Sequence, residues 1–87
     1  MANHPSAEKR NRQRITRTTR NRMVRSAVRT HVKAVRDAVK AGQKDGAKKA
    51  LAIAISALDK AASKGVLHRK SVSRSIARLS AAVQKLG

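Results

Sequence analysis

Residues 24–42 read VRSAVRTHVKAVRDAVKAG, and this stretch decides the fold. Its valines recur at steps of four, four, three and four residues. That spacing places them in one stripe, because an α-helix has about 3.6 residues per turn. The valine seam consists of Val24, Val28, Val32, Val35 and Val39. Gly42 follows as the natural C-terminal stop. The stretch therefore predicts a helix that packs its valines against neighbouring helices.

Basic side chains form a second row along the same helix. They also recur at steps of three and four residues, so they share one side of it. The row consists of Arg22, Arg25, Arg29, Lys33, Arg36 and Lys40. The helix is thus expected to carry an apolar seam and a separate charged seam.

The segment before the valines, residues 8–25, reads EKRNRQRITRTTRNRMVR. Eight of these eighteen residues are Lys or Arg, and only Ile15, Met23 and Val24 are large and apolar. Such a segment cannot bury a hydrophobic face against its own protein. We therefore expect it to project from the folded core and to need a partner outside the chain.

The charge of the whole chain indicates what that partner is. The 87 residues include 22 Lys and Arg against four acidic residues, which gives a formal charge of +18. A protein so basic is expected to bind a polyanion. Because the chain has no Phe, Tyr or Trp, it cannot stack bases as many single-strand binders do. Arginine guanidinium groups match phosphate oxygens instead, so we expect recognition of backbone and shape.

We expect three helices and no strand, because no stretch sustains an alternating pattern. The expected boundaries are about Ser6 to Ala41, Asp45 or Gly46 to Ser63, and His68 to Lys85. Ser6 and Asp45 are the candidate N-caps. Short connections make consecutive helices antiparallel neighbours. The predicted fold is therefore all-α: an antiparallel three-helix bundle with a long N-terminal helix projecting beyond it.

Helix lengths and apolar seams divide the chain. The seams expected on the second and third helices are Leu51, Ile55, Leu58 and Ala62, and Val72, Ile76, Leu79, Val83 and Leu86. A helix of about 35 residues spans roughly 52 Å and one of about 18 residues only roughly 27 Å, so the second covers half of the first. A helix with Arg on every side can contact phosphates of several strands at once, which suits a folded RNA better than one groove of a duplex. We therefore expect one domain over residues 1–87, with an RNA-binding extension at 6–22 and the bundle at 23–87.

A second basic cluster surrounds the expected start of the third helix, in HRKSVSR at residues 68–74. It consists of His68, Arg69, Lys70, Arg74 and Arg78. Cations near a helix N-terminus destabilise the helix, so the presence of a basic cluster at this position argues for a functional role. A phosphate bound there would also meet free backbone N–H groups.

Other chemistry is poorly supported by the residues. The chain has no Cys, and His4, His31 and His68 lack metal-ligand spacing. We expect no enzyme activity, metal, cofactor, small-molecule substrate, membrane partner or homo-oligomer. No apolar run has the length of a membrane helix or signal peptide, so a cytoplasmic location is expected.

The sequence resembles the bacterial ribosomal protein S20 family over nearly its whole length. The likeness is carried by MANHPSAEKR at the start, RSAVRTHVKAV and AGQK near the end of the first helix, and KGVLHRK before the third. The resemblance implies a helical bundle that binds small-subunit ribosomal RNA in the cytoplasmic ribosome. It implies RNA contacts at Lys9, Arg10, Gln13, Arg17, Asn21, Arg25, Ser26, Arg29, Thr30 and Lys33, and around His68.

The basic run adds Arg12, Arg14, Arg20 and Arg22 to this candidate set, and the second cluster adds Arg69, Lys70, Arg74 and Arg78. The expected function is that of a structural constituent of the small ribosomal subunit. It would bind 16S ribosomal RNA directly and stabilise its folded form during assembly, with other subunit components as possible neighbours. A nucleoid-type DNA-binding protein is the alternative, although such proteins normally show a helix-turn-helix or a minor-groove wedge. A membrane-surface helix would need a strong apolar face, which the basic run lacks.

Overall fold

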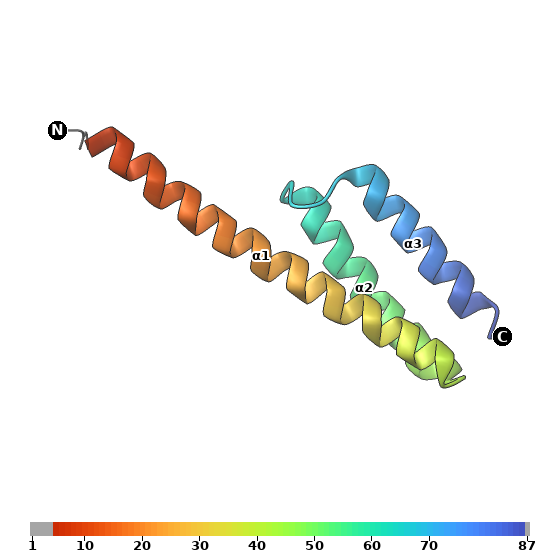
Figure 1. Ribbon diagram of the computed structural model, residues 1–87. Helices are drawn as coiled ribbons and strands as arrows, with labels where there is room; N and C mark the ends of the chain where they lie inside the picture. The colour runs from red at the N-terminus through yellow and green to blue at the C-terminus, as the bar shows by residue number, and fades with distance from the viewer. Residues whose placement is uncertain (1–4, 87) are drawn as a thin grey trace.

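The computed structural model describes residues 5–86, and these form three helices and no strand (Figure 1). Helix α1 spans Pro5–Lys40, α2 spans Lys44–Ser63 and α3 spans Arg69–Gln84. The predicted all-α fold is confirmed. Each helix contacts both of the others, and α1 packs most extensively against α2.

The shape of the molecule follows from the unequal helix lengths. Helix α1 has 36 residues and α2 has 20. In Figure 1, α2 runs back along the C-terminal half of α1, α3 lies beside α2, and no helix accompanies the N-terminal half of α1. The radius of gyration is 17.6 Å, whereas a compact domain of this length has about 12 Å. The long first helix therefore projects beyond the bundle, as predicted.

The core joins the valine seam of α1 to apolar side chains of the other helices. Val28 and Val35 are buried, and the other valines of the seam pack against the same core. On α3 the buried residues are Val72, Leu79 and Val83, which lie in the predicted seam. These residues form one apolar core, which holds the C-terminal half of α1 against the other two helices.

Helix α2 follows the predicted seam only in part: Leu58 is buried, and Leu51 and Ala62 pack against the core. Its buried residues are Ala47, Ala54, Leu58 and Ala61. The predicted Leu51, Ile55 and Ala62 are only half-buried. Three of these four buried residues are alanines, so α2 contributes mainly small side chains to the core, and its larger Leu51 and Ile55 stay partly exposed.

Two glycines reverse the chain between helices. Gly42 has φ +70°, and the N–H groups of Gly42 and Gln43 donate to the carbonyls of Val39 and Ala38, both at 3.0 Å. Gly65 has φ +75° and ends α2 with the same hydrogen-bond pattern. This left-handed C-terminal motif suits glycine, because a Cβ atom disfavours positive φ.

The predicted helix starts need correction. Helix α1 begins at Pro5, so Ser6 lies inside the helix rather than at its cap. The N-cap of α2 is Gln43, and the predicted cap Asp45 lies in the first turn. The negative charge of Asp45 still stabilises the helix there, because it interacts favourably with the helix dipole. Helix α2 starts earlier than predicted because the turn at Gly42 is short, so that the next residue, Gln43, is already the N-cap.

We expect Gly42→Ala to lower the free energy of unfolding by about 1–2 kcal/mol, because alanine resists the left-handed conformation. Gly46→Ala is the matched control. Gly46 lies within α2, and an added Cβ would meet only the Gln43 side chain, at 3.4 Å. Its effect should be neutral or stabilising by up to about 1 kcal/mol. Urea unfolding followed by circular dichroism measures both, and equal effects would contradict the assigned role of Gly42.

Candidate nucleic-acid interface

The N-terminal half of α1 forms an exposed surface that is rich in basic side chains. Every side chain from Ala7 to Arg20 is exposed, so none of them is buried against another part of the described chain. We call the candidate residues here the N-terminal basic surface: Lys9, Arg10, Arg12, Gln13, Arg14, Arg17, Arg20, Asn21 and Arg22. Asn21 alone among them is half-buried, at the point where the bundle begins. The charge of this surface is available to a partner on all sides of the helix.

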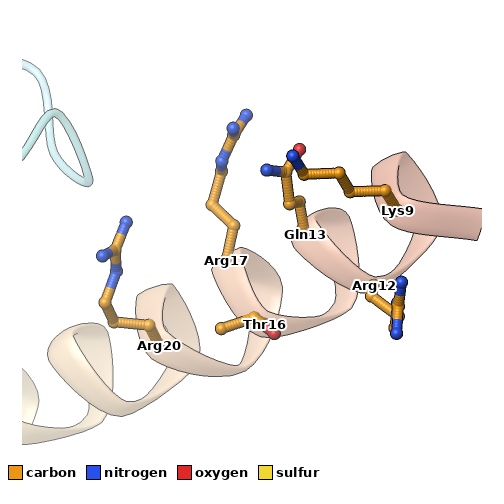
Figure 2. Close-up of a pocket in the computed structure, with 6 residues that line it drawn as sticks. All are labelled: Lys9, Arg12, Gln13, Thr16, Arg17 and Arg20. Atoms are coloured by element: carbon orange, nitrogen blue, oxygen red, sulfur yellow. The ribbon is translucent and has the colours of Figure 1, made fainter. Parts of the chain in front are cut away.

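Side chains four residues apart line a shallow pocket on this surface. Figure 2 shows Lys9, Gln13 and Arg17 projecting together from one side of α1, with Arg12 turned toward another side. Arg20 lies one turn further along. No carboxylate lines the pocket. Two pairs of basic side chains three residues apart, Lys9 with Arg12 and Arg17 with Arg20, repel by about 0.2–0.5 kcal/mol per pair. An anion lying along the pocket would remove that repulsion and receive several hydrogen bonds.

The candidate residues in the middle of α1 form a second group, which we call the mid-helix surface: Arg25, Ser26, Arg29, Thr30 and Lys33. All five are exposed. Four of them line one shallow groove together with Arg36. Arg36 was absent from the predicted site, although it belongs to the basic row seen in the sequence.

Two local hydrogen bonds define what this surface can donate. The Thr30 hydroxyl donates to the Ser26 carbonyl at 3.0 Å, which occupies its only proton and leaves it as an acceptor. Arg25 Nε donates to the Asn21 carbonyl at 3.4 Å, a long and therefore weak bond. The Arg25 guanidinium thus keeps its terminal N–H groups for a phosphate, whereas Thr30 suits a donor such as a ribose hydroxyl.

The third candidate group surrounds the start of α3, and we call it the α3 surface: His68, Arg69, Lys70, Arg74 and Arg78. All five side chains are exposed. His68 is the N-cap of α3, and its Nδ1 accepts a hydrogen bond from the Lys70 backbone N–H at 3.1 Å. In the neutral ring, Nε2 therefore carries the proton and can donate it outward. The imidazole has a structural role that the sequence did not reveal.

The fold places these groups along one elongated molecule. The N-terminal basic surface and the mid-helix surface follow each other on α1. The end of α2 lies beside the place where α1 leaves the bundle, because Lys60 and Lys64 share a groove with Val24 and Ala27. The α3 surface starts just after this point (Figure 1), and further along it meets Arg36 of α1 in a crevice with Arg74 and Arg78.

The described residues show little support for other chemistry. No three side chains of His, Cys, Asp or Glu gather within residues 5–86 to hold a metal ion; His4 lies outside the described residues. None of the helices in that range is long and apolar enough to cross a membrane. His31 is half-buried and lines an apolar groove between α1 and α2 that contains no carboxylate. An imidazole alone does not make an acid–base site.

Comparison with known proteins shows the family of this chain. The family model for ribosomal protein S20 matches residues 2–84. The small ribosomal subunit protein bS20 of Geotalea daltonii is 55% identical over 86 residues, which cover 99% of both chains. The protein of the same name from Geotalea uraniireducens is 54% identical over the full length of both. That of Sorangium cellulosum is 54% identical over 98% of this chain and 89% of its own. The chain therefore belongs to the ribosomal protein S20 family.

Proposed function

We propose that this chain is a structural constituent of the small ribosomal subunit in the cytoplasm, and that it binds 16S ribosomal RNA directly through Arg and Lys contacts to phosphates. Binding would stabilise the folded form of the RNA during assembly. Its family is one of ribosomal proteins rather than enzymes. The RNA contacts would lie on the three candidate surfaces, with residues 6–22 acting as an RNA-binding extension of the bundle at 23–87.

One observation carries the proposal: the first half of α1 is basic, exposed and unaccompanied by the rest of the described chain. A helix with arginines on every side can contact phosphates of several strands at once, which suits a folded RNA better than a single groove of a duplex. The absence of aromatic residues from the sequence leaves backbone and shape as the means of recognition.

We expect the affinity for small-subunit ribosomal RNA to fall steeply with salt. If about eight phosphates are contacted, log affinity should fall against log salt concentration with a slope of about −6 to −7. Filter binding of the full chain to a 16S RNA transcript at several KCl concentrations measures this slope. A slope shallower than about −2 would exclude a mechanism based on backbone phosphates.

The same titration on duplex DNA of equal length distinguishes the proposed function from that of a nucleoid-type DNA-binding protein. A nucleoid-type protein would bind duplex DNA at least as tightly as structured RNA at equal salt, whereas the proposed function requires preference for the RNA. Nuclease footprinting on the same transcript then shows whether protection is confined to defined segments. Protection spread evenly over the RNA would contradict specific recognition.

A further inference from the structure

Three arginines from two helices line one crevice on the side of the bundle where α1 meets α3. Arg36 comes from α1, and Arg74 and Arg78 come from α3. Val32 and the buried Leu79 also line the crevice. The three charged groups therefore lie around an apolar floor, whereas the N-terminal basic surface lies on a single helix open to solvent.

The charge in this crevice is not neutralised by the protein. All four acidic residues of the chain lie in the described part, and none of them lines the crevice. Arg74 and Arg78 are four residues apart on α3, a spacing at which like charges destabilise a helix. Arg36 adds a third positive charge from the neighbouring helix. The arrangement costs stability until an anion is bound.

Size and chemistry select the kind of anion. The crevice has a volume of about 160 Å³, below the roughly 300–1,000 Å³ of pockets that hold whole small molecules. A phosphate group is small, carries negative charge on several oxygens and matches the planar fork of guanidinium. The hydroxyl of Ser75, which also lines the crevice, can supply one further donor.

We propose that Arg36, Arg74 and Arg78 form one anion site, in which α1 and α3 together hold a single phosphate group of the RNA backbone. The source of that phosphate rests on the proposed RNA-binding function. A phosphate shared in this way links α3 to α1, a pair of helices that pack on each other less extensively than either packs on α2. RNA binding would thereby fix the position of α3 in the bundle.

A double-mutant cycle on RNA affinity tests the shared phosphate. We expect Arg36→Gln and Arg78→Gln each to weaken binding roughly tenfold, as for loss of a charged hydrogen-bonded contact. The double variant should lose much less than the product of the two, because both side chains act on one phosphate. All three arginines of the site are exposed, so these changes leave the core intact, which circular dichroism checks.

Two controls calibrate the cycle. Arg36→Gln combined with Arg17→Gln should give multiplied losses, because Arg17 lies on the projecting part of α1, roughly 28 Å away along the helix. Lys40→Gln removes the same charge from the same row of α1, but Lys40 does not line the crevice, so its effect should be clearly smaller than that of Arg36→Gln. Multiplied losses for Arg36 and Arg78 would exclude a single RNA phosphate shared by these two side chains.

Inorganic phosphate tests the site independently of RNA. In the full chain, phosphate should shift the NMR signals of the three arginine Nε–H groups together, relative to chloride at equal ionic strength. Shifts without any RNA binding would support the site and refute the proposed function. RNA binding with a multiplicative cycle and no shift would refute the site alone. Shifts with a multiplicative cycle would refute RNA as the source of the phosphate.

Discussion

Deletion of residues 1–22 is expected to leave the helical bundle folded and to abolish specific binding to small-subunit ribosomal RNA. The valine seam begins after the cut, at Val24. The deleted segment contains one large aliphatic residue after Met1, Ile15, and that side chain is 58% exposed. The core should therefore lose almost nothing, and the free energy of unfolding should change by less than about 0.5 kcal/mol.

The RNA affinity should respond very differently. The deletion removes seven of the 22 basic side chains and the part of α1 that projects beyond the bundle. If each of the seven lost charges contributes about 0.4 kcal/mol or more, the affinity falls by roughly a hundredfold or more at about 0.1 M salt. The salt slope should flatten by several units, because fewer counterions are released from the RNA. Filter binding and thermal unfolding measure the two quantities separately.

A charge-only variant separates charge from length. Replacing the seven basic residues of the same segment by Gln keeps the chain length and the capacity to form a helix. If phosphate contacts carry recognition, this variant should lose as much affinity as the deletion. A deletion that unfolds the protein, or that binds RNA as tightly as the full chain, would contradict the division into a bundle and an RNA-binding extension.

The sequence could predict the long helix because its valines have one unambiguous period. Helix α2 was harder, since alanines occur on most of its sides and periodicity cannot choose between them. The structure buries Ala47 and Ala54 completely and leaves Ile53 54% exposed. Which face an alanine-rich helix buries depends on how closely its neighbours approach, and that distance is a property of the packed bundle.

The candidate site also has parts that the sequence could predict and parts that it could not. The basic run on α1 could be predicted, because its exposure follows from the lack of apolar residues around it. The crevice of Arg36 with Arg74 and Arg78 could not, because it depends on the rotation of α3 relative to α1. The cap formed by His68 was also hidden, since histidine is not among the preferred N-cap residues.

Val35→Asp is expected to unfold the bundle. Val35 has no exposed surface, so the change loses about 1.5–3 kcal/mol of apolar burial. It also places a carboxylate without a described partner in the core, which costs several kcal/mol more. The free energy of unfolding of a small domain is only about 5 kcal/mol or somewhat more. Circular dichroism should therefore show loss of most helical signal and of the cooperative thermal transition.

Ala34→Asp is the matched control for this variant, because it introduces the same charge one residue away at an exposed position of α1. It should cost only a few tenths of a kcal/mol and keep the transition. Val35→Asp should also weaken RNA binding, but indirectly: RNA selects the folded fraction, so apparent affinity falls in proportion to that fraction. The basic residues of α1 remain unchanged, and the salt slope should therefore stay steep while the affinity drops. A folded Val35→Asp protein with a normal transition would show that the valine seam is not the core.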